Sequence, residues 1–547
     1  MATFKLDEKD VSFEPGETII QAATRAGIEI PHYCWHPGLS IAANCRMCLV
    51  EMMPPPGRKA MMLDVVRFDV ATQTYVKEQK PKLVPACQQA AAPGMEIRSD
   101  SSQFVEKARA SVQEFLLLNH PVDCPICDQA GECKLQDYWL LHGATKKRMA
   151  DEPVHKPKGV VFGPTIVYDA ERCIACTRCI RLCDEVAKDP VLSLRQRGNL
   201  NEITVAPGRQ LDHNYTLMTE YVCPVGALTA KDFRFKARVW FLRHADTVCT
   251  GCAKGCNSET DFDPRNQQVY RFRPRANAQV NGHWMCDEGM LSYKDISVDR
   301  KTAAELDGQV VTVQTALETA LRSLKGTEGK LLEGKEVAIL LGAGFSLEDN
   351  AALLWLGHRL GVDAYFETGR PDGKSDSVLM MADKNANSRG VRQLLGKEPG
   401  RLEELTDGLR SGRFTHVIAL GTTLKDVSQE PWFSSLRKNL VVLGTHGGAL
   451  ARAAAVFLPV AVPVECEGTF VNAAGLAQKS AKCVRPAGDA EPAHRIVLRL
   501  IEGLGLGSPW KSVADLRNLM LSGFLPNAAS NANTVNPPSA NAGAVAP

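Results

Sequence analysis

The chain has 547 residues, too many for a single hydrophobic core, so two to four domains are expected. Lys and Arg total 64 and Asp and Glu total 62, and this balance gives no reason to expect a nucleic acid as partner. The N-terminus lacks the apolar core of a signal peptide, and the longest apolar run, residues 451–464, is interrupted by Arg452, Pro459 and Pro463. A soluble or peripheral protein is therefore expected.

The distribution of the 18 cysteines is the main clue to chemistry, because 16 of them precede residue 290. A long chain without a signal peptide rarely depends on disulfides. Cysteines in closely spaced groups then indicate metal ligands.

Residues 1–100 have the pattern of a small β-rich domain, with a short strand at 3–6, another at 11–13 and a helix over 17–26. A long stretch, residues 54–85, begins with three consecutive prolines, continues with apolar alternation over 62–70 and then a charged stretch, and predicts an inserted surface hairpin.

The first cysteine group has two cysteines close together and two at a distance. This arrangement suits a [2Fe–2S] cluster, which takes two thiolates on each iron. A zinc ribbon is the alternative, but it usually has two CxxC pairs and this group has one. The candidate ligands are Cys34, Cys45, Cys48 and Cys87.

Residues 101–118 predict a helix that leads into a second group, HPVDCPICDQAGEC. This segment offers one imidazole and three thiolates to a single centre. Both a [4Fe–4S] cluster and a structural zinc ion of Cys₃His type accept such a set. The candidate ligands are His120, Cys124, Cys127 and Cys133.

A third group has the two-residue spacing of a ferredoxin [4Fe–4S] site, at Cys173, Cys176 and Cys179. Two cysteines compete to be its fourth ligand. Cys183 completes a local C-x₂-C-x₂-C-x₃-C run, and the distant Cys223 is followed by proline, as fourth ligands of ferredoxins often are.

A fourth group has the spacing C-x₂-C-x₃-C, and one more cysteine follows after 29 intervening residues. Again a cluster or zinc fits the set: Cys249, Cys252, Cys256 and Cys286. After residue 300 the apolar runs 336–342, 416–421 and 440–444 predict buried parallel strands separated by helices, hence an α/β domain. Residues 526–547 are rich in Asn, Ala, Ser and Pro and predict a disordered tail.

Several of these segments resemble one family. PHYCWHPGLSIAANCRMCLVE, HPVDCPICDQAGECKLQ, and RCIACTRCIR with YVCPVGAL resemble the large iron–sulfur subunit of bacterial complex I, whose mitochondrial counterpart is the 75 kDa subunit. The resemblance implies one [2Fe–2S] cluster on the Cys34 group and a His-ligated [4Fe–4S] cluster on the His120 group. It also implies a [4Fe–4S] cluster on the third group that uses Cys223, with Cys183 as a spare buried thiol.

The fourth group resembles the cluster domain at the front of molybdopterin oxidoreductases, and CEGTFVNAAGLAQ, residues 466–478, resembles a later segment of the same fold. The chain is shorter than a complete enzyme of that kind and has no cysteine between Cys286 and Cys466 to hold molybdenum. The expectation is therefore a third [4Fe–4S] cluster, a truncated non-catalytic domain and no molybdopterin.

The fold class implied is an α+β multidomain protein. It begins with a β-grasp [2Fe–2S] ferredoxin domain, continues with His/Cys and ferredoxin-like [4Fe–4S] domains, and ends in a truncated molybdopterin-oxidoreductase-like α/β domain. The expected boundaries are 1–100, 101–150, 151–240, 241–300 for the molybdopterin-oxidoreductase-type cluster domain, 301–525 for the α/β domain, and 526–547 for the tail.

The function implied is electron transfer in an NADH:quinone oxidoreductase, without catalytic residues in this chain. The expected partners are an FMN- and NADH-binding flavoprotein, a small [2Fe–2S] subunit and quinone-side hydrophilic subunits, on the cytoplasmic side of the bacterial inner membrane. Electrons would pass the Cys173 cluster and then the His120 cluster, with the Cys34 cluster near the input and the Cys249 cluster off the main path. The alternatives are the catalytic subunit of an NAD-linked formate dehydrogenase and an iron hydrogenase.

Overall fold

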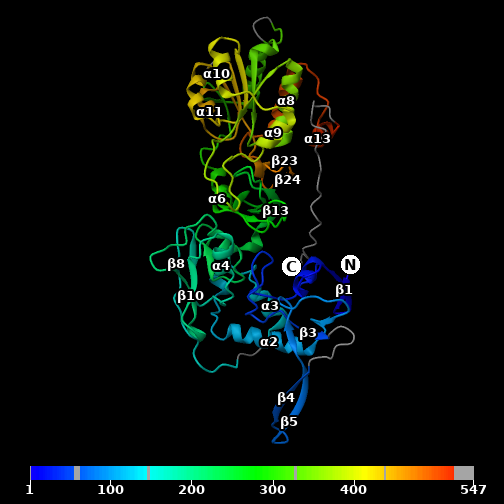
Figure 1. Ribbon diagram of the computed structural model, residues 1–547. Helices are drawn as coiled ribbons and strands as arrows, with labels where there is room; N and C mark the ends of the chain where they lie inside the picture. The colour runs from blue at the N-terminus through cyan, green and yellow to red at the C-terminus, as the bar shows by residue number, and fades with distance from the viewer. Residues whose placement is uncertain (1, 54–61, 144–147, 326–328, 437–438, 523–547) are drawn as a thin grey trace. The chain divides into compact units, whose positions relative to one another are not determined.

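The computed structural model describes residues 2–53, 62–143, 148–325, 329–436 and 439–522 (Figure 1). The chain divides into two compact units, with the boundary between Trp240 and Phe241. Each unit has a hydrophobic core of its own. The expected tail, residues 526–547, lies outside the described residues.

The first unit begins with a small mixed sheet that packs against one helix. The side chains of Phe4 and Leu6 are buried while those of Thr3 and Lys5 are exposed, as the two-residue period of a half-buried strand requires. Helix α1 (Ile19–Arg25) adds its apolar face to the same core. The sheet order is β2 (Lys9–Phe13), β1 (Ala2–Leu6), β7 (Glu96–Arg98), β3 (Leu49–Met53) and β6 (Leu83–Pro85). This confirms the expected β-grasp domain.

The expected insertion contains a two-stranded hairpin, β4 (Met62–Asp69) and β5 (Thr74–Pro81), paired over eight residues. Figure 1 shows this hairpin extending away from the β-grasp sheet. Among the described residues neither strand pairs with any other strand. The hairpin therefore leaves the pairing of β3 with β6 intact.

The rest of the first unit consists of short elements joined by long loops. Helix α2 (Gln103–Leu117) starts at Ser102, whose hydroxyl accepts the N–H of Val105, and helix α3 (Lys134–His142) follows the second cysteine group. The remaining elements are β8 (Val160–Val161), β9 (Ile166–Tyr168), α4 (Arg178–Arg181), β10 (Leu192–Arg195), β11 (Glu202–Val205), α5 (Leu217–Tyr221) and β12 (Leu228–Ala230). Loops of this kind suit cluster ligands, because the chain must wrap around the inorganic core.

The second unit starts with a three-stranded antiparallel sheet, β13 (Arg243–Val248), β14 (Asn257–Asp263) and β15 (Gln268–Pro274). The short helix α6 (Asp287–Leu291) follows, and the hairpin of β23 (Gly468–Val471) and β24 (Ala477–Ser480) joins this region from much later in the chain. The side chain of Gln478 donates a hydrogen bond of 2.8 Å to the carbonyl of Gly255, which fastens the hairpin to the fourth cysteine group.

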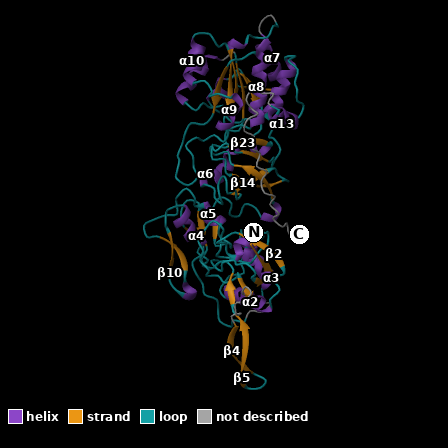
Figure 2. Ribbon diagram, turned by 45° about the vertical axis from the view of Figure 1, so that its right-hand side comes forward, coloured by secondary structure: helices purple, strands orange, loops and turns teal. Residues whose placement is uncertain are grey.

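A seven-stranded sheet forms the larger part of the second unit (Figure 2). Its order is β17 (Gln309–Val311), β16 (Ala304–Leu306), β22 (Val456–Pro459), β21 (Leu440–Gly444), β20 (His416–Leu420), β18 (Val337–Gly342) and β19 (Ala364–Thr368). The five strands from β22 to β19 are parallel. At one edge, β16 pairs antiparallel with β22, and β17 pairs antiparallel with β16. The three apolar runs of the sequence thus form β18, β20 and β21.

Helices cover both faces of this sheet. Along β18, Ile339 and Leu341 belong to one core and Ala338 and Leu340 to the other, so the two-residue period supplies both faces. The first core contains residues of α7 (Val313–Lys325), α8 (Leu347–Leu360), α9 (Ser388–Leu395), α12 (Ala493–Gly503) and α13 (Val513–Leu521). The second contains residues of α10 (Leu402–Arg410) and α11 (Ala449–Ala453). The expected α/β domain is confirmed.

The glycine-containing turn after β18 is closed by Asn350. The Asn350 side chain accepts the N–H of Gly342 at 2.8 Å and donates to its carbonyl at 2.9 Å. This turn is therefore held by the chain itself. No helix within the described parts of the chain is long and apolar enough to cross a membrane.

Candidate iron–sulfur sites

The Cys34 group lies in the loops of the β-grasp domain. Its thiols form two hydrogen-bonded pairs, Cys34 with Cys45 and Cys48 with Cys87. The hydrogen bond from Cys45 lowers the pKa of Cys34, and the one from Cys48 lowers the pKa of Cys87. A [2Fe–2S] cluster takes two thiolates on each iron, so the pairs have the grouping that this cluster requires.

The loop before Cys48 directs backbone N–H groups at sulfur. The N–H groups of Asn44 and Cys45 both point at the Sγ of Cys34. Ala43 and Arg46 have φ values of 51° and 61°, in the left-handed region, and such residues let a short loop curl its N–H groups toward one anionic centre. Donors to sulfur stabilise the thiolate and help to set a cluster's potential.

The His120 group occupies the loop between α2 and α3. Cys124 starts a short 3₁₀ turn, Cys124–Ile126, and Cys133 is the N-cap residue of α3. Cys127 and Cys133 are each close enough to Cys124 for their charges to interact. Cys127 is buried and Cys124 is exposed, so this group has one edge at the surface of its unit.

His120 has the form of a metal-binding imidazole. Its buried Nδ1 has no hydrogen-bond partner in the described chain, although buried polar atoms normally have one. Burial, with a smaller contribution from the positive charge of Arg172, lowers the pKa of His120 to about 4, so the ring is neutral near pH 7. Arg172 also lies within electrostatic range of Cys127. A neutral ring with an unsatisfied nitrogen fits a ligand to iron.

The third group lines one small pocket. Its four cysteines are Cys173, Cys176, Cys179 and Cys223. Ala175 and Thr177 have φ values of 53° and 63°, and the N–H of Ala175 donates to the Sγ of Cys173 at 3.4 Å. The hydroxyl of Tyr168 also donates to the Sγ of Cys173. The pocket offers thiols and donors to a cubane.

Cys183 does not line this pocket. Its Sγ lies 3.4 Å from the Nε2 of His213, whose Nδ1 accepts the N–H of Tyr215 at 3.1 Å. Burial raises the pKa of Cys183 to about 12, so it is a neutral thiol at neutral pH. Of the two candidates for a fourth ligand, Cys223 is the one that shares the pocket.

The fourth group lies in the second unit, between β13 and β14 and at the start of α6. Its four cysteines line one small pocket: Cys249, Cys252, Cys256 and Cys286. The N–H of Gly251 donates to the Sγ of Cys249, and that of Gly289 to the Sγ of Cys286, each at 3.4 Å. A Cβ on Gly289 would lie 3.0 Å from the Sγ of Cys249, so only glycine leaves the thiol free there.

Two of the groups in the first unit touch each other. A Cβ on Gly226, three residues after Cys223, would lie well inside the contact distance of the Cys127 Sγ. The N–H of Lys134 donates to the carbonyl of Pro224 at 3.0 Å. Arg172, next to Cys173, pairs with Asp123, next to Cys124, at 2.9 Å. The His120 group and the Cys173 group therefore share one packed boundary.

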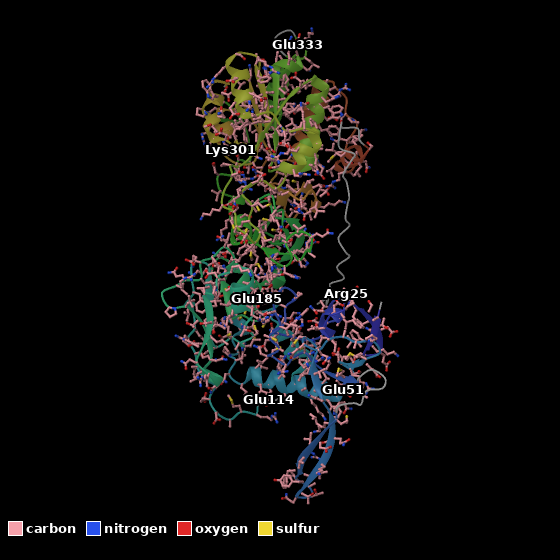
Figure 3. The ribbon with its side chains drawn as sticks, in the orientation of Figure 1. Arg25, Glu51, Glu114, Glu185, Lys301 and Glu333 are labelled. Carbon is pink, nitrogen blue, oxygen red and sulfur yellow. The ribbon has the colours of Figure 1, made fainter. Side chains whose placement is uncertain are left out.

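The Cys34 group also adjoins the Cys173 group. Arg181 donates to the carbonyl of Cys34 at 2.6 Å and to that of Cys176 at 3.3 Å. The N–H of Ser40 donates to Glu185, which Figure 3 labels, at 2.8 Å. The Cys173 group is thus the middle member of three adjacent groups.

Sequence reasoning missed Tyr168, Arg172, Arg178, Arg181 and His213. The arginines flank the cysteines in RCIACTRCIR, but a pattern in sequence does not reveal what a long side chain reaches.

In the described residues no three His, Cys, Asp or Glu side chains are grouped as ligands of a single metal ion.

Comparison with known families divides the chain in the same order. A 2Fe-2S iron–sulfur cluster binding domain matches residues 1–102, and the NADH-ubiquinone oxidoreductase-G iron–sulfur binding region matches 109–148. The ferredoxin-like domain of NADH-quinone oxidoreductase subunit 3 matches 163–229, and the molybdopterin oxidoreductase family matches 282–503.

The names of similar proteins agree with these family matches. The G subunit of the NADH-quinone oxidoreductase of Rickettsia felis is 34% identical, over 67% of this chain and 50% of the relative. The mitochondrial NADH dehydrogenase [ubiquinone] iron-sulfur protein 1 of Solanum tuberosum is 27% identical, over 94% of this chain and 81% of the relative. The alignments with the Rickettsia relatives span about half of their length. A solved NAD⁺-reducing [NiFe]-hydrogenase chain is 28% identical, over 44% of this chain and 91% of that chain, with a TM-score of 0.35.

Fold and sites together define an iron–sulfur protein in which a [2Fe–2S] domain and [4Fe–4S] domains precede a molybdopterin-oxidoreductase-type α/β domain. Within that class, the chain belongs to the family of the large iron–sulfur subunit, or G subunit, of NADH-quinone oxidoreductases.

Proposed function

We propose that this chain relays electrons, one at a time, as the large iron–sulfur subunit of an NADH:quinone oxidoreductase. The observation that carries the proposal is the adjacency of three cysteine groups in one compact unit. Electron tunnelling falls steeply with distance, so a relay needs its centres held in a fixed series. The chain would hold the clusters, donate hydrogen bonds to their thiolates and exclude water from them.

The ligand assignment is part of the proposal. A [2Fe–2S] cluster would be held by Cys34, Cys45, Cys48 and Cys87. Three [4Fe–4S] clusters would be held by His120, Cys124, Cys127 and Cys133, by Cys173, Cys176, Cys179 and Cys223, and by Cys249, Cys252, Cys256 and Cys286. Pairing of thiols in the first set and the shared pockets of the last two support this assignment.

The contacts suggest the order of the series. The Cys173 group adjoins the Cys34 group through Arg181 and the His120 group through Gly226. An electron that enters at the Cys34 side would therefore pass the Cys173 cluster before the His120 cluster. The Cys249 group belongs to the other unit, and we place it off this series.

The His120 group is the proposed exit. Cys124 is exposed, and the side chains of Val122 and Ile126 beside it are 91% and 62% exposed. An exposed ligand with apolar neighbours suits docking of the next electron carrier, because the carrier would cover both. The proposed partners are a flavoprotein that binds FMN and NADH, a small [2Fe–2S] subunit and quinone-side hydrophilic subunits, at the cytoplasmic side of the bacterial inner membrane.

We propose that the α/β domain holds no molybdopterin cofactor. Cys466 is the first cysteine after Cys286, and a cysteine that binds molybdenum must do so as a thiolate. The Cys466 side chain is buried beside the carboxylates of Asp349, Glu465 and Glu348. Those carboxylates would also repel an anionic cofactor. The domain therefore has a structural role in this proposal.

Elemental analysis of the anaerobically purified full chain tests the proposal. Four clusters predict about 14 iron atoms per chain, with matching sulfide and without molybdenum. About ten iron atoms would mean that one cubane is absent. Stoichiometric molybdenum or tungsten would favour the formate-dehydrogenase alternative, and zinc in place of iron would defeat the proposal.

A further inference from the structure

Two arginines one helical turn apart on α4, Arg178 and Arg181, connect the loops of two proposed clusters. Each reaches from the Cys173 group to the Cys34 group. Neither makes an ion pair with a carboxylate in the described part of the chain, so both positive charges face cysteines and carbonyls.

Arg178 is the more deeply placed of the two. Its side chain is buried and lines the pocket of the Cys173 group. It donates to the carbonyl of Val222 at 3.1 Å and to that of Trp35 at 2.5 Å, the residues that precede Cys223 and follow Cys34. Its Nε is buried and has no hydrogen-bond partner in the described residues. One N–H of the guanidinium therefore remains for an acceptor in or beside the pocket.

Arg181 makes a second connection between the same loops. One nitrogen donates to the carbonyls of Cys34 and Cys176, and another donates to the carbonyl of Ser40. Ser40 is fixed in turn by the carboxylate of Glu185, which accepts its N–H. The guanidinium thus joins the backbone of one ligand from each proposed cluster.

The charges matter because each cluster gains one negative charge when it is reduced. Arg178 lies within electrostatic range of Cys176, Cys223 and Cys34, which belong to both groups. In a buried site with little water to screen it, an unpaired guanidinium stabilises the reduced form of each neighbouring cluster and so raises its potential. Five fixed donors also resist movement of the loops more than a lysine would.

We propose that Arg178 and Arg181 are positioning residues that hold the Cys34 and Cys173 clusters at a fixed separation and raise the reduction potentials of both. This inference rests on the proposed function. It adds that the electron equilibrium between the two clusters depends on a cationic bridge that they share.

The test uses the full-length chain, purified anaerobically, with redox titration followed by electron paramagnetic resonance. Arg178→Gln removes the buried charge and should lower the midpoint potentials of both clusters. Arg178→Lys keeps the charge and should restore most of the shift. Arg181→Gln should weaken the magnetic interaction between the clusters, seen as slower spin relaxation, and lower both potentials less. The control is Arg195→Gln on β10, which pairs with Glu202 and touches no cysteine.

The outcomes are distinct. Potentials in Arg178→Gln equal to those of the control would overturn the bridge, as would a shift confined to one cluster. If Arg178→Gln does not load its clusters, Arg181→Gln decides: a fall in both potentials supports the bridge and unchanged values overturn it. Absence of both cluster signals in the unmodified chain would instead defeat the proposed function.

Discussion

Tyr168 shows how one hydroxyl can act on two parts of a site. It donates to the Sγ of Cys173 and accepts the N–H of Ile203 at 3.0 Å. The first bond favours a more negative sulfur, and the second fixes the ring at the pocket wall. Both are lost together when the hydroxyl is removed.

We expect Tyr168→Phe to lower the midpoint potential of the Cys173 cluster, because one donor to its sulfur disappears. Stability should fall by about 1 kcal/mol for each lost hydrogen bond. Redox titration and thermal unfolding measure the two effects. Tyr75→Phe on the exposed hairpin is the matched control, and an equal potential in both variants would contradict the role of the hydroxyl.

Gly226 occupies a position where a side chain does not fit. Alanine would place its Cβ against the Sγ of Cys127 and 3.1 Å from the Cβ of Gln129. We expect Gly226→Ala to displace Cys127 and cost the chain about four iron atoms, the content of one cubane. Iron and sulfide analysis measures this. Gly344→Ala, where the added Cβ meets nothing within 4 Å, should retain the full content, and equal iron in the two variants would contradict the contact.

At the scale of elements, the hairpin β4–β5 is an appendage to the β-grasp sheet. Its strands pair only with each other in the described chain, and most of its side chains are exposed. We expect replacement of residues 54–81 by a short glycine-containing turn to leave the [2Fe–2S] cluster intact, because β3 still pairs with β6 next to Cys48 and Cys87. Visible circular dichroism of the cluster measures this. Loss of the [2Fe–2S] signal would show that the hairpin supports the site.

Helices α8 and α12 are joined by a buried polar contact between Asp349 and His494. The carboxylate of Asp349 accepts the N–H and the ring Nδ1 of His494, at 2.9 and 3.0 Å, and the hydroxyl of Ser346. Asp349→Asn should destabilise the second unit by about 1 to 3 kcal/mol, because it disturbs buried hydrogen bonds. Asp363→Asn, at an exposed site, should change little. Thermal unfolding measures both.

The same carboxylate gives the second unit a pH dependence. Burial opposes ionisation of Asp349, but the hydrogen bonds from His494 and Ser346 outweigh it and hold the pKa below the usual 3.8. The resulting stability is present above about pH 3.8 and is lost as pH falls through the lower native value. The Asp349→Asn variant should lack this acid-dependent step, and an unchanged acid profile in urea unfolding would contradict the assignment.

At the scale of the whole molecule, the three adjacent groups and their cores fall within one compact unit. A fragment of residues 1–240 should therefore fold alone and bind about ten iron atoms, from one [2Fe–2S] and two [4Fe–4S] clusters. Iron analysis and electron paramagnetic resonance of the fragment test this. A fragment that folds but carries fewer clusters than the full chain would show that the second unit completes a site in the first.

Much of the fold could be predicted because its causes are local. The continuous apolar run in residues 336–342 marks a strand that is buried on both faces, and closely spaced groups such as Cys124, Cys127 and Cys133 mark a loop around a centre. The strand order of the large sheet could not be predicted, because the antiparallel β16 reaches β22 across about 150 residues of sequence.

The ligand sets remain predictions. They depend on contacts between segments that are far apart in sequence, as the strand order of the large sheet does. Cys183 is closer in sequence to Cys179 than Cys223 is, yet it faces His213. The reach of Arg178 and Arg181 depends on two loops separated by about 140 residues, and no local pattern encodes it.

The contact at Gly226 has a consequence for how the chain survives oxygen. The segment that carries Cys223 packs directly on Cys127, so each of the two sites forms part of the wall of the other. Oxidative loss of one cubane would loosen that wall and expose its neighbour to the same damage. Assembly of the clusters would follow the reverse course, since insertion of the first cubane would order the segment that receives the second. The pair would then be built, lost and repaired as a unit.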